Sequence, residues 1–289
     1  MADSEATDTE KTNRDPGEMK TAVIVPTYNS PDALEVVLRG YSLQDDQEFE
    51  VIVADDGSTE DTKTLLDRLR GQMPFSMTHV WQEDKGFRLA AVRNRAVAAT
   101  QADYIIFTDG DCIPSRRFVS AHKQLAEQGY FLAANRILMS QRLSEEILRN
   151  RSSLSSWGWA EWCVARARQD IDKLLPLVVL PDGAFRKWSP HRWQGLKTCN
   201  LSLWREDLLR INGLDESYEG WGLDDSDLVV RLFHAGIKHK SARFAAPVFH
   251  LWHRESDRSS YHKNQERFSK VLQARAIRAM VGLDQYVIR

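Results

Sequence analysis

Short apolar runs alternate with amphipathic stretches along the first half of the chain. Strands are predicted over residues 21–25, a buried apolar run, and over residues 49–54, 77–81 and 104–108. The stretches between and after them have the apolar spacing of helices, over residues 31–40, 59–70, 87–100 and 115–128. Strands that alternate with helices indicate right-handed βαβ units. We therefore expect an α/β fold whose central sheet is mostly parallel and is covered by helices on both faces.

Beyond residue 130 the pattern is less regular. Residues 141–195 contain helix-like stretches, a tryptophan-rich segment and a loop region punctuated by prolines. Further strands are predicted over residues 197–204 and 247–252, and further helices over residues 205–212 and 223–235. This half therefore predicts a helical, Trp-rich insert beside the sheet.

The two ends of the chain differ in charge. Residues 1–18 carry six acidic and two basic side chains and no aromatic one, which predicts a disordered acidic tail before a domain over residues 19–253. Residues 254–289 carry eight basic and four acidic side chains, and their apolar spacing predicts an amphipathic helix. We favour a helix packed on its own domain; the alternative is a basic face that contacts an anionic membrane surface.

Composition narrows the function classes. A chain of 289 residues with net charge −2 can form one large domain or two small ones, and its balanced charge argues against a nucleic-acid binder. No apolar run is long enough to cross a membrane, and the acidic start lacks the apolar region of a signal peptide. Three cysteines without a CxxC pair indicate a reducing compartment, so we expect a cytoplasmic protein.

Polar clusters follow three of the predicted strands, at residues 26–29, 55–58 and 109–111. Ligands of such sheets bind at the carboxyl ends of the strands, so the clusters predict a common site. Asp109 and Asp111 flank Gly110, and such carboxylates suit Mg²⁺ or Mn²⁺, although a plain acidic turn would look the same. Neither a dinucleotide-binding glycine motif nor a P-loop is present. Basic residues near the helix over 87–100 could instead help hold a diphosphate; they are Lys85, Arg88, Arg93 and Arg95.

A second group of ionisable residues lies late in the chain. Asp224 and Asp225 follow Trp221 at a predicted helix start, where the helix dipole favours ionised carboxylates and one of them could act as a general base. His250 and His253 follow the last predicted strand and could complete a metal site that begins with Asp111. Each feature also has a purely structural explanation.

Five motifs occur in one order: V-P-T-Y-N at 25–29, V-A-D-D-G-S at 53–58, K-G-F-R at 85–88 with R-N at 93–94, D-G-D at 109–111 and G-W-G-L-D-D at 220–225. With them, residues 20–253 resemble the family 2 glycosyltransferases, which are inverting, metal-dependent and built on the GT-A fold. The last motif also resembles the W-G-x-E-D segment of β-1,4-galactosyltransferases and bacterial chondroitin polymerases. Asp224 stands where those enzymes have Glu, which leaves the identity of the acceptor open.

The resemblance implies a nucleotide-binding half up to about residue 130 and an acceptor half after it. Nucleotide contacts are implied for Pro26, Thr27, Tyr28, Asn29, Asp56, Arg88, Arg93, Asp109 and Gly110. Mn²⁺ or Mg²⁺ would be bound by Asp111 and His250, with Asp109 close by and His253 as the alternative histidine. Asp225 would be the general base, while Asp224 and Trp221 would bind the acceptor.

The implied reaction moves a sugar from a nucleotide-sugar donor, with UDP as the best guess, to a hydroxyl of a glycan or glycolipid. Surface polysaccharide or lipopolysaccharide synthesis at the inner face of the membrane fits the habits of the family. One competing interpretation is a sugar-1-phosphate nucleotidyltransferase, which would have a glycine-rich phosphate loop where this chain has P-T-Y-N. The other is a non-catalytic carbohydrate-binding protein, which would suit eight tryptophans between Trp157 and Trp252 but not the paired acids.

Overall fold

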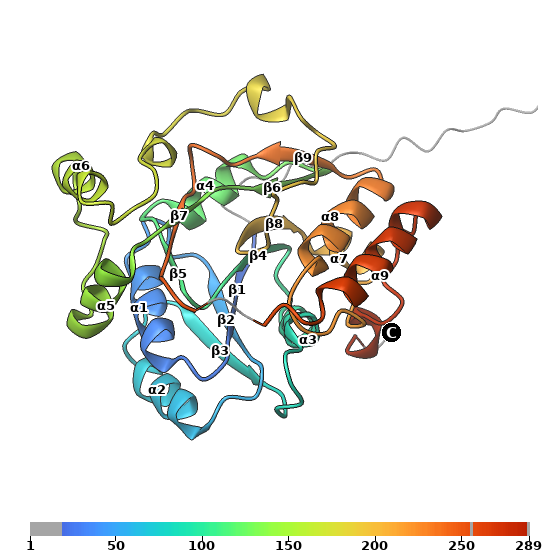
Figure 1. Ribbon diagram of the computed structural model, residues 1–289, viewed down its shortest axis with the longest axis horizontal. Coiled ribbons are helices and arrows are strands. Elements are labelled where there is room, and N and C mark those ends of the chain that lie inside the picture. Colours follow the sequence, from blue (N-terminus) through green and yellow to red (C-terminus); the bar gives the residue numbers. More distant parts are fainter. Residues whose placement is uncertain (1–18, 255–256, 288–289) are drawn as a thin grey trace, which may run out of the picture.

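The computed structural model describes residues 19–254 and 257–287, so the acidic tail predicted over residues 1–18 lies outside the described residues. Its centre is a seven-stranded sheet in the order β3-β2-β1-β4-β8-β6-β9 (Figure 1). These strands are β1 (Thr21–Thr27), β2 (Glu50–Asp55), β3 (Ser76–Trp81), β4 (Tyr104–Thr108), β6 (Tyr130–Ala133), β8 (Asn200–Trp204) and β9 (Lys238–Ser241). The first four are mutually parallel, whereas β8 runs antiparallel to β4 and β6. The mostly parallel sheet predicted from the sequence is confirmed.

Helices cover both faces of this sheet. One face is covered by α1 (Pro31–Ser42), α2 (Glu60–Arg70) and α4 (Phe118–Leu125), and their core continues into α5 (Gln141–Asn150) and α6 (Trp159–Ala167), which lie outside α1 (Figure 1). The other face is covered by α3 (Leu89–Ala98), α7 (Arg205–Arg210) and α8 (Asp224–His234). Side chains of β1 divide accordingly, because alternate residues of a strand point to opposite faces: Val23 and Val25 join the first core, Ala22 and Ile24 the second.

A second, three-stranded sheet was not predicted. It contains β5 (Cys112–Pro114), β10 (Val248–His250) and β7 (Arg136–Leu138), in that order. Each strand has only three residues, too few for a hydrophobic alternation to stand out, and the strand predicted over 247–252 is correspondingly shorter. Pairing of β10 with β5 places His250 opposite Cys112, the residue after Asp111. The small sheet therefore brings the D-G-D loop and the late histidines together.

The insert over residues 141–195 packs against the small sheet through aromatic rings. Besides α5 and α6 it contains two short 3-10 helices, η1 (Leu175–Leu177) and η2 (Ala184–Lys187). Trp162 is buried and stacks on Phe249 of β10, with ring centroids 4.7 Å apart and planes inclined by 6°. Trp157 contacts Trp162 with the same centroid distance. These two tryptophans are therefore packing residues next to the strand that ends at His250.

The amphipathic helix predicted near the C-terminus is α9 (Tyr261–Ala274), and it packs beside α8 (Figure 1). Phe268 is buried and meets Trp193 edge to face at 5.1 Å. A last 3-10 helix, η3 (Leu283–Gln285), buries Leu283 against the core that contains α3. The favoured interpretation, a helix packed on its own domain, agrees with these contacts. Among the described residues no helix is both long and apolar enough to cross a membrane.

Candidate active site

A cavity of about 590 Å³ opens where β1, β2 and β4 end. It is lined by twelve of the residues predicted from the sequence: Pro26, Thr27, Tyr28, Asp56, Arg93, Asp109, Asp111, Trp221, Asp224, Asp225, His250 and His253. Both halves of the chain therefore contribute to one site. Sequence reasoning missed further lining residues with reactive or charged groups, namely Arg136, Lys197, Thr198, Cys199 and Arg258.

Three of the predicted nucleotide-binding residues shape the loops without lining the cavity. The side-chain oxygen of Asn29 accepts a hydrogen bond of 2.9 Å from the backbone N–H of Thr59, which joins the loops after β1 and β2. The guanidinium of Arg88 donates to the Glu83 carbonyl. At Gly110, a Cβ atom would lie 2.2 Å from the Pro26 carbonyl oxygen, so only glycine lets the D-G-D loop pass this close to β1. Their roles in nucleotide binding stay predictions.

Asp56 lines the cavity directly after β2. Its carboxylate accepts hydrogen bonds from Gln82 Nε2 at 2.6 Å and from the backbone N–H of Arg88 at 2.8 Å. Burial raises the pKa of this carboxyl above its usual value, and the two hydrogen bonds oppose the shift. Tyr28 is half exposed beside it, with its hydroxyl donating to Asp84 Oδ2 at 2.9 Å. Together these side chains form a polar end with a flat aromatic wall.

Arg93 is fully buried beneath the D-G-D loop. One amino group, Nη2, donates to Asp109 Oδ1 at 2.7 Å and to the Thr108 carbonyl at 3.1 Å. The other, Nη1, donates to Thr198 Oγ1 at 2.7 Å. Burial raises the pKa of Asp109 to about 6, and the charge of Arg93 opposes that shift. The predicted place of Arg93 near the ribose or diphosphate stays a prediction; its two amino groups bind protein oxygens, so it also positions Asp109.

Asp224 and Asp225 are the first two residues of α8, where the helix dipole favours negative charge. The chain reaches this position through left-handed backbone at Gly222 (φ +112°) and Leu223 (φ +71°). Asp225 Oδ1 accepts hydrogen bonds from the hydroxyl and, at 3.2 Å, the backbone N–H of Thr198. Burial, followed by the charge of Asp225, raises the pKa of Asp224 to about 7. The two neighbouring acids therefore have different environments.

The predicted metal ligands converge at the end of β10. His250 Nε2 and His253 Nε2 lie 3.6 Å and 3.2 Å from Asp111 Oδ2. One donor atom of each residue lies within 4.8 Å of the others, so the structure brings both histidines to Asp111. Asp111, which both histidines approach, is half-buried.

Three observations make this set suitable for a divalent cation. Asp111 Oδ1 is buried and has no hydrogen-bond partner among the described residues. His253 Nδ1 lies 2.7 Å from the Arg254 carbonyl oxygen, which can only accept, so Nδ1 donates this hydrogen bond and Nε2 is the ring nitrogen that faces Asp111. Burial lowers the pKa of His250, which keeps that imidazole neutral near pH 7. One carboxylate and two imidazoles fit Mn²⁺ or another first-row divalent ion.

The part of the cavity around Trp221 is aromatic and basic. The guanidinium of Arg258 lies 4.8 Å from the ring centroid of Trp221, and the ring centroid of Tyr261 lies 6.0 Å from it. Trp252 is 43% exposed and also lines the cavity. Indole faces suit the C–H faces of sugar rings. Exposed rings near Asp225 therefore provide a surface for a carbohydrate.

Comparisons with known proteins match both halves of the chain. Residues 22–174 match glycosyl transferase family 2, and residues 183–254 match a family described as the N-terminal domain of galactosyltransferase. A validoxylamine A glucosyltransferase of Streptomyces hygroscopicus subsp. jinggangensis is 30% identical over 266 residues, covering 86% of this chain and 60% of that protein. Chondroitin synthase of Pasteurella multocida is 28% identical over 241 residues, covering 74% of this chain and 23% of that protein. The chain thus spans less than two thirds of the length of these relatives.

Solved structures with the same arrangement include a mannosyltransferase of Pyrobaculum calidifontis in complex with GDP-Man and Mn²⁺. It superposes with a TM-score of 0.60 at 20% identity, covering 93% of this chain and 67% of that one. TarS (residues 1–349) of Staphylococcus aureus in complex with UDP superposes with a TM-score of 0.55 at 15% identity, covering 93% of this chain and 68% of that one. At these identities the likeness establishes the fold.

Proposed function

Because the chain belongs to glycosyl transferase family 2, we propose that it transfers a sugar from a nucleotide-sugar donor to a hydroxyl group of a glycan or glycolipid acceptor, with inversion at the anomeric carbon. The family, the enzyme class and the GT-A fold expected from the sequence are confirmed. The observation that carries the proposal is the convergence of the D-G-D loop, Asp225 and the Asp111–His250–His253 set on one cavity.

The donor would bind on the side of β1 and β2. Asp56 presents a buried carboxylate to a base, and the half-exposed ring of Tyr28 offers a face for stacking. A uracil ring has an N–H that such a carboxylate can accept, so we favour UDP as the nucleotide. TarS, a structural neighbour described in complex with UDP-GlcNAc, supports this choice.

Asp111, His250 and His253 would hold the divalent cation. Two imidazole ligands favour Mn²⁺ over Mg²⁺, which prefers oxygen ligands and water. A cation bound there supplies positive charge beside the leaving diphosphate. The neighbouring mannosyltransferase described with GDP-Man and Mn²⁺ supports a cation in this fold.

Asp225 would take the proton from the acceptor hydroxyl as that oxygen attacks the anomeric carbon. The new carbon–oxygen bond forms while the bond to the donor phosphate breaks, and the nucleoside diphosphate leaves from the opposite face. Thr198 would hold the Asp225 carboxylate in position, and Asp109 would be held by Arg93. Asp224 and Trp221 would bind the acceptor, and Trp221 lies among the cavity-lining residues beside Arg258.

For the acceptor we propose a surface polysaccharide or lipopolysaccharide, since chondroitin synthase and TarS are among the proteins to which the chain is similar. A nucleotidyltransferase is less well supported, because the loop after β1 has Pro26 and Tyr28 in place of a glycine-rich phosphate loop. A non-catalytic carbohydrate-binding protein would leave the buried Arg93–Thr198–Asp225 connection without a role.

A donor screen tests the proposal. The protein is incubated with UDP-, GDP- and other nucleotide-linked sugars and a mixture of glycan acceptors, with Mn²⁺, Mg²⁺ or chelator. We expect a nucleoside diphosphate to be released with one donor class in the presence of cation, and little from Asp225→Asn. Release of pyrophosphate from a sugar 1-phosphate and a nucleoside triphosphate would instead identify a nucleotidyltransferase. Donor binding without turnover in any condition would support the non-catalytic alternative.

A further inference from the structure

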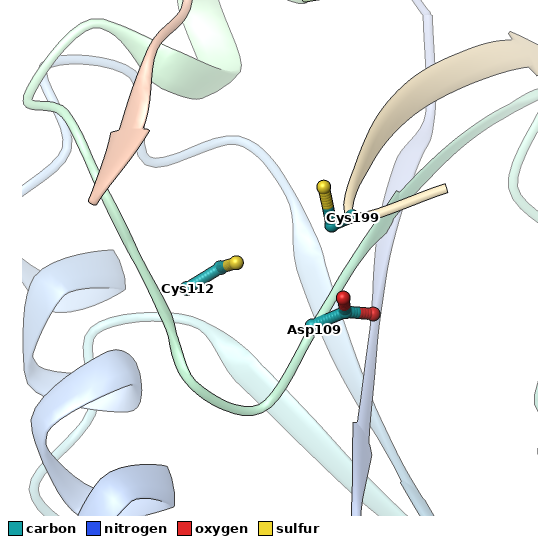
Figure 2. Close-up of side chains that lie close together, drawn as sticks. All are labelled: Asp109, Cys112 and Cys199. Carbon is teal, nitrogen blue, oxygen red and sulfur yellow. The ribbon is translucent and has the colours of Figure 1, made fainter. Parts of the chain in front are cut away.

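Two buried thiols lie beside the D-G-D loop, outside the Asp111–His250–His253 set. Cys112 is the first residue of β5, one residue after Asp111, and Cys199 directly precedes β8. Figure 2 shows the Cys112 sulfur pointing toward Cys199 and the Asp109 carboxylate. One atom of each of these three residues lies within 4.8 Å of the others. Segments far apart in the sequence thus bring two sulfur atoms and a carboxylate together.

This donor set differs chemically from the neighbouring one. Thiolates select soft or borderline cations such as Zn²⁺ and Cd²⁺, whereas a carboxylate with two imidazoles also accepts Mn²⁺. Tetrahedral zinc has sulfur ligands at about 2.3 Å and carboxylate oxygens at about 2.0–2.2 Å. Ligand atoms around such an ion are therefore roughly 3.5–4 Å apart. Small side-chain rotations would bring the three donors to that spacing, and Cys199 lines the cavity, which gives a cation a route to the site.

We propose that Cys112, Cys199 and Asp109 form a binding site for a thiophilic divalent cation such as Zn²⁺ or Cd²⁺, and that its occupation inhibits the enzyme. Each thiol gives its proton to solvent when its sulfur binds the cation. Asp109 Oδ1, which now accepts from Arg93 at 2.7 Å, would turn toward the cation. The Arg93 contact that orients Asp109 would then be lost, and Thr198, next to Cys199, would shift against Asp225.

Cadmium binding tests the site without relying on activity. The full chain is titrated with Cd²⁺, and the ultraviolet thiolate-to-cadmium charge-transfer band is recorded for the wild type and three serine variants. Cys163 is exposed and lies outside the cluster, so Cys163→Ser is the matched control. We expect the wild type and Cys163→Ser to give the same band, and Cys112→Ser and Cys199→Ser to bind at least about tenfold more weakly. The proposal is overturned if the band is absent from the wild type or survives in Cys112→Ser/Cys199→Ser.

Two further arms separate this site from its neighbour and from misfolding. His253→Ala removes a donor of the Asp111–His250–His253 set and leaves both thiols in place, so this variant should keep the cadmium band. Loss of the band in His253→Ala would mean that the Cd²⁺ ion binds at the Asp111–His250–His253 set and would contradict the proposal. If a serine variant does not fold, alkylation of the wild type gives the answer. Cys163 should react equally with and without Cd²⁺, while Cys199 should be protected by Cd²⁺ and exposed again by chelator. The labelling time is set so that Cys199 reacts in the absence of Cd²⁺; equal labelling of Cys199 with and without Cd²⁺ then contradicts the proposal.

The inhibition rests on the proposed transferase function, whereas cation binding does not. In excess Mn²⁺, Zn²⁺ should reduce turnover of the wild type and Cys163→Ser at least about tenfold, and that of Cys112→Ser much less, each relative to its own zinc-free rate. A cadmium band in a protein without transferase activity would keep the site and reject the function. Equal zinc inhibition of all three proteins would reject the inhibitory role.

Discussion

Thr198 donates both its hydroxyl and its backbone N–H to the same oxygen of Asp225. The hydroxyl also accepts from Arg93, which in turn binds Asp109. Hydrogen bonds to a carboxylate favour its ionised form and fix its direction. Thr198, which lies between the Arg93 guanidinium and the Asp225 carboxylate, therefore connects the D-G-D loop with the proposed general base.

Replacing Thr198 by Val keeps the shape and the backbone N–H but removes the hydroxyl. We expect kcat to fall roughly tenfold to a hundredfold with little change in the KM for the donor, since one charge-assisted hydrogen bond is worth about 1.5–3 kcal/mol. Thr198→Ser restores the hydroxyl and should behave like the wild type. A kcat of Thr198→Val equal to that of the wild type would show that the hydroxyl does not act on the base.

Replacing Asp225 by Asn removes the proton acceptor while keeping the size of the side chain. Turnover should fall by about 10²–10⁴, the usual contribution of a general base, and the donor affinity measured by calorimetry should stay within a few fold. Asp224→Asn is the comparison, because that acid lies next to it at the start of the same helix. It should raise the KM for the acceptor more than it lowers kcat. Wild-type-like turnover of Asp225→Asn would reject the assignment of the base.

His253→Ala removes one of the three donors that meet at Asp111. The Mn²⁺ concentration needed for half-maximal activity should rise at least about tenfold, as measured by a metal titration at saturating donor. His262 is an exposed histidine of α9 and serves as the control, so His262→Ala should leave the titration unchanged. Asp111→Ala should have the largest effect, and an unaltered titration there would contradict the site.

Gly110→Ala tests the close approach of the D-G-D loop to β1. The added Cβ would meet the Pro26 carbonyl oxygen at 2.2 Å, so the loop must move. We expect a loss of about 1–3 kcal/mol in the free energy of unfolding and a marked loss of donor binding. Gly71→Ala is the matched control, because nothing lies within 4 Å of its Cβ position and its φ is −80°. Donor binding by Gly110→Ala at wild-type strength would show that the loop tolerates the shift.

Asp207, which does not line the cavity, should make the free energy of unfolding depend on pH. Burial raises its pKa to about 6, and Oδ2 has no hydrogen-bond partner among the described residues. The folded-state pKa lies above the unfolded one, so ionisation of Asp207 destabilises the fold progressively as the pH rises from about 4 through 6. Asp207→Asn should raise the free energy of unfolding by about 2 kcal/mol at pH 8 and change it little at pH 4. Urea unfolding at both pH values checks this, and equal effects at the two would contradict it.

The parts of the fold that could be predicted are those that leave a pattern within a short stretch of sequence. Strands β1, β2 and β4 are almost wholly buried and therefore read as apolar runs, whereas the edge strand β3 is only half-buried. The polar clusters that follow β1, β2 and β4 marked the cavity. The small sheet has no such signal, since β5, β7 and β10 are three residues long and are strands only because they pair with each other. Thr198 was missed for the same reason, because its role comes from contacts with Arg93 and Asp225, which are distant in sequence. Arg93 was located in the site, but its hydrogen bonds to Thr198 and Asp109 were not predicted, because a sequence does not show which distant side chains meet a buried arginine.

The pairing of β10 with β5 has a consequence for the order in which the protein acquires its properties during synthesis. The ribosome releases β1 to β4 and the D-G-D loop before residue 250 emerges. The core beside α3 also contains side chains of β8, α7 and α8, and a domain generally folds as a unit, so this early half does not form its site alone. The histidines that complete Asp111 belong to the last part of the domain to be synthesised, and the proposed cation set is assembled only when β10 has paired with β5.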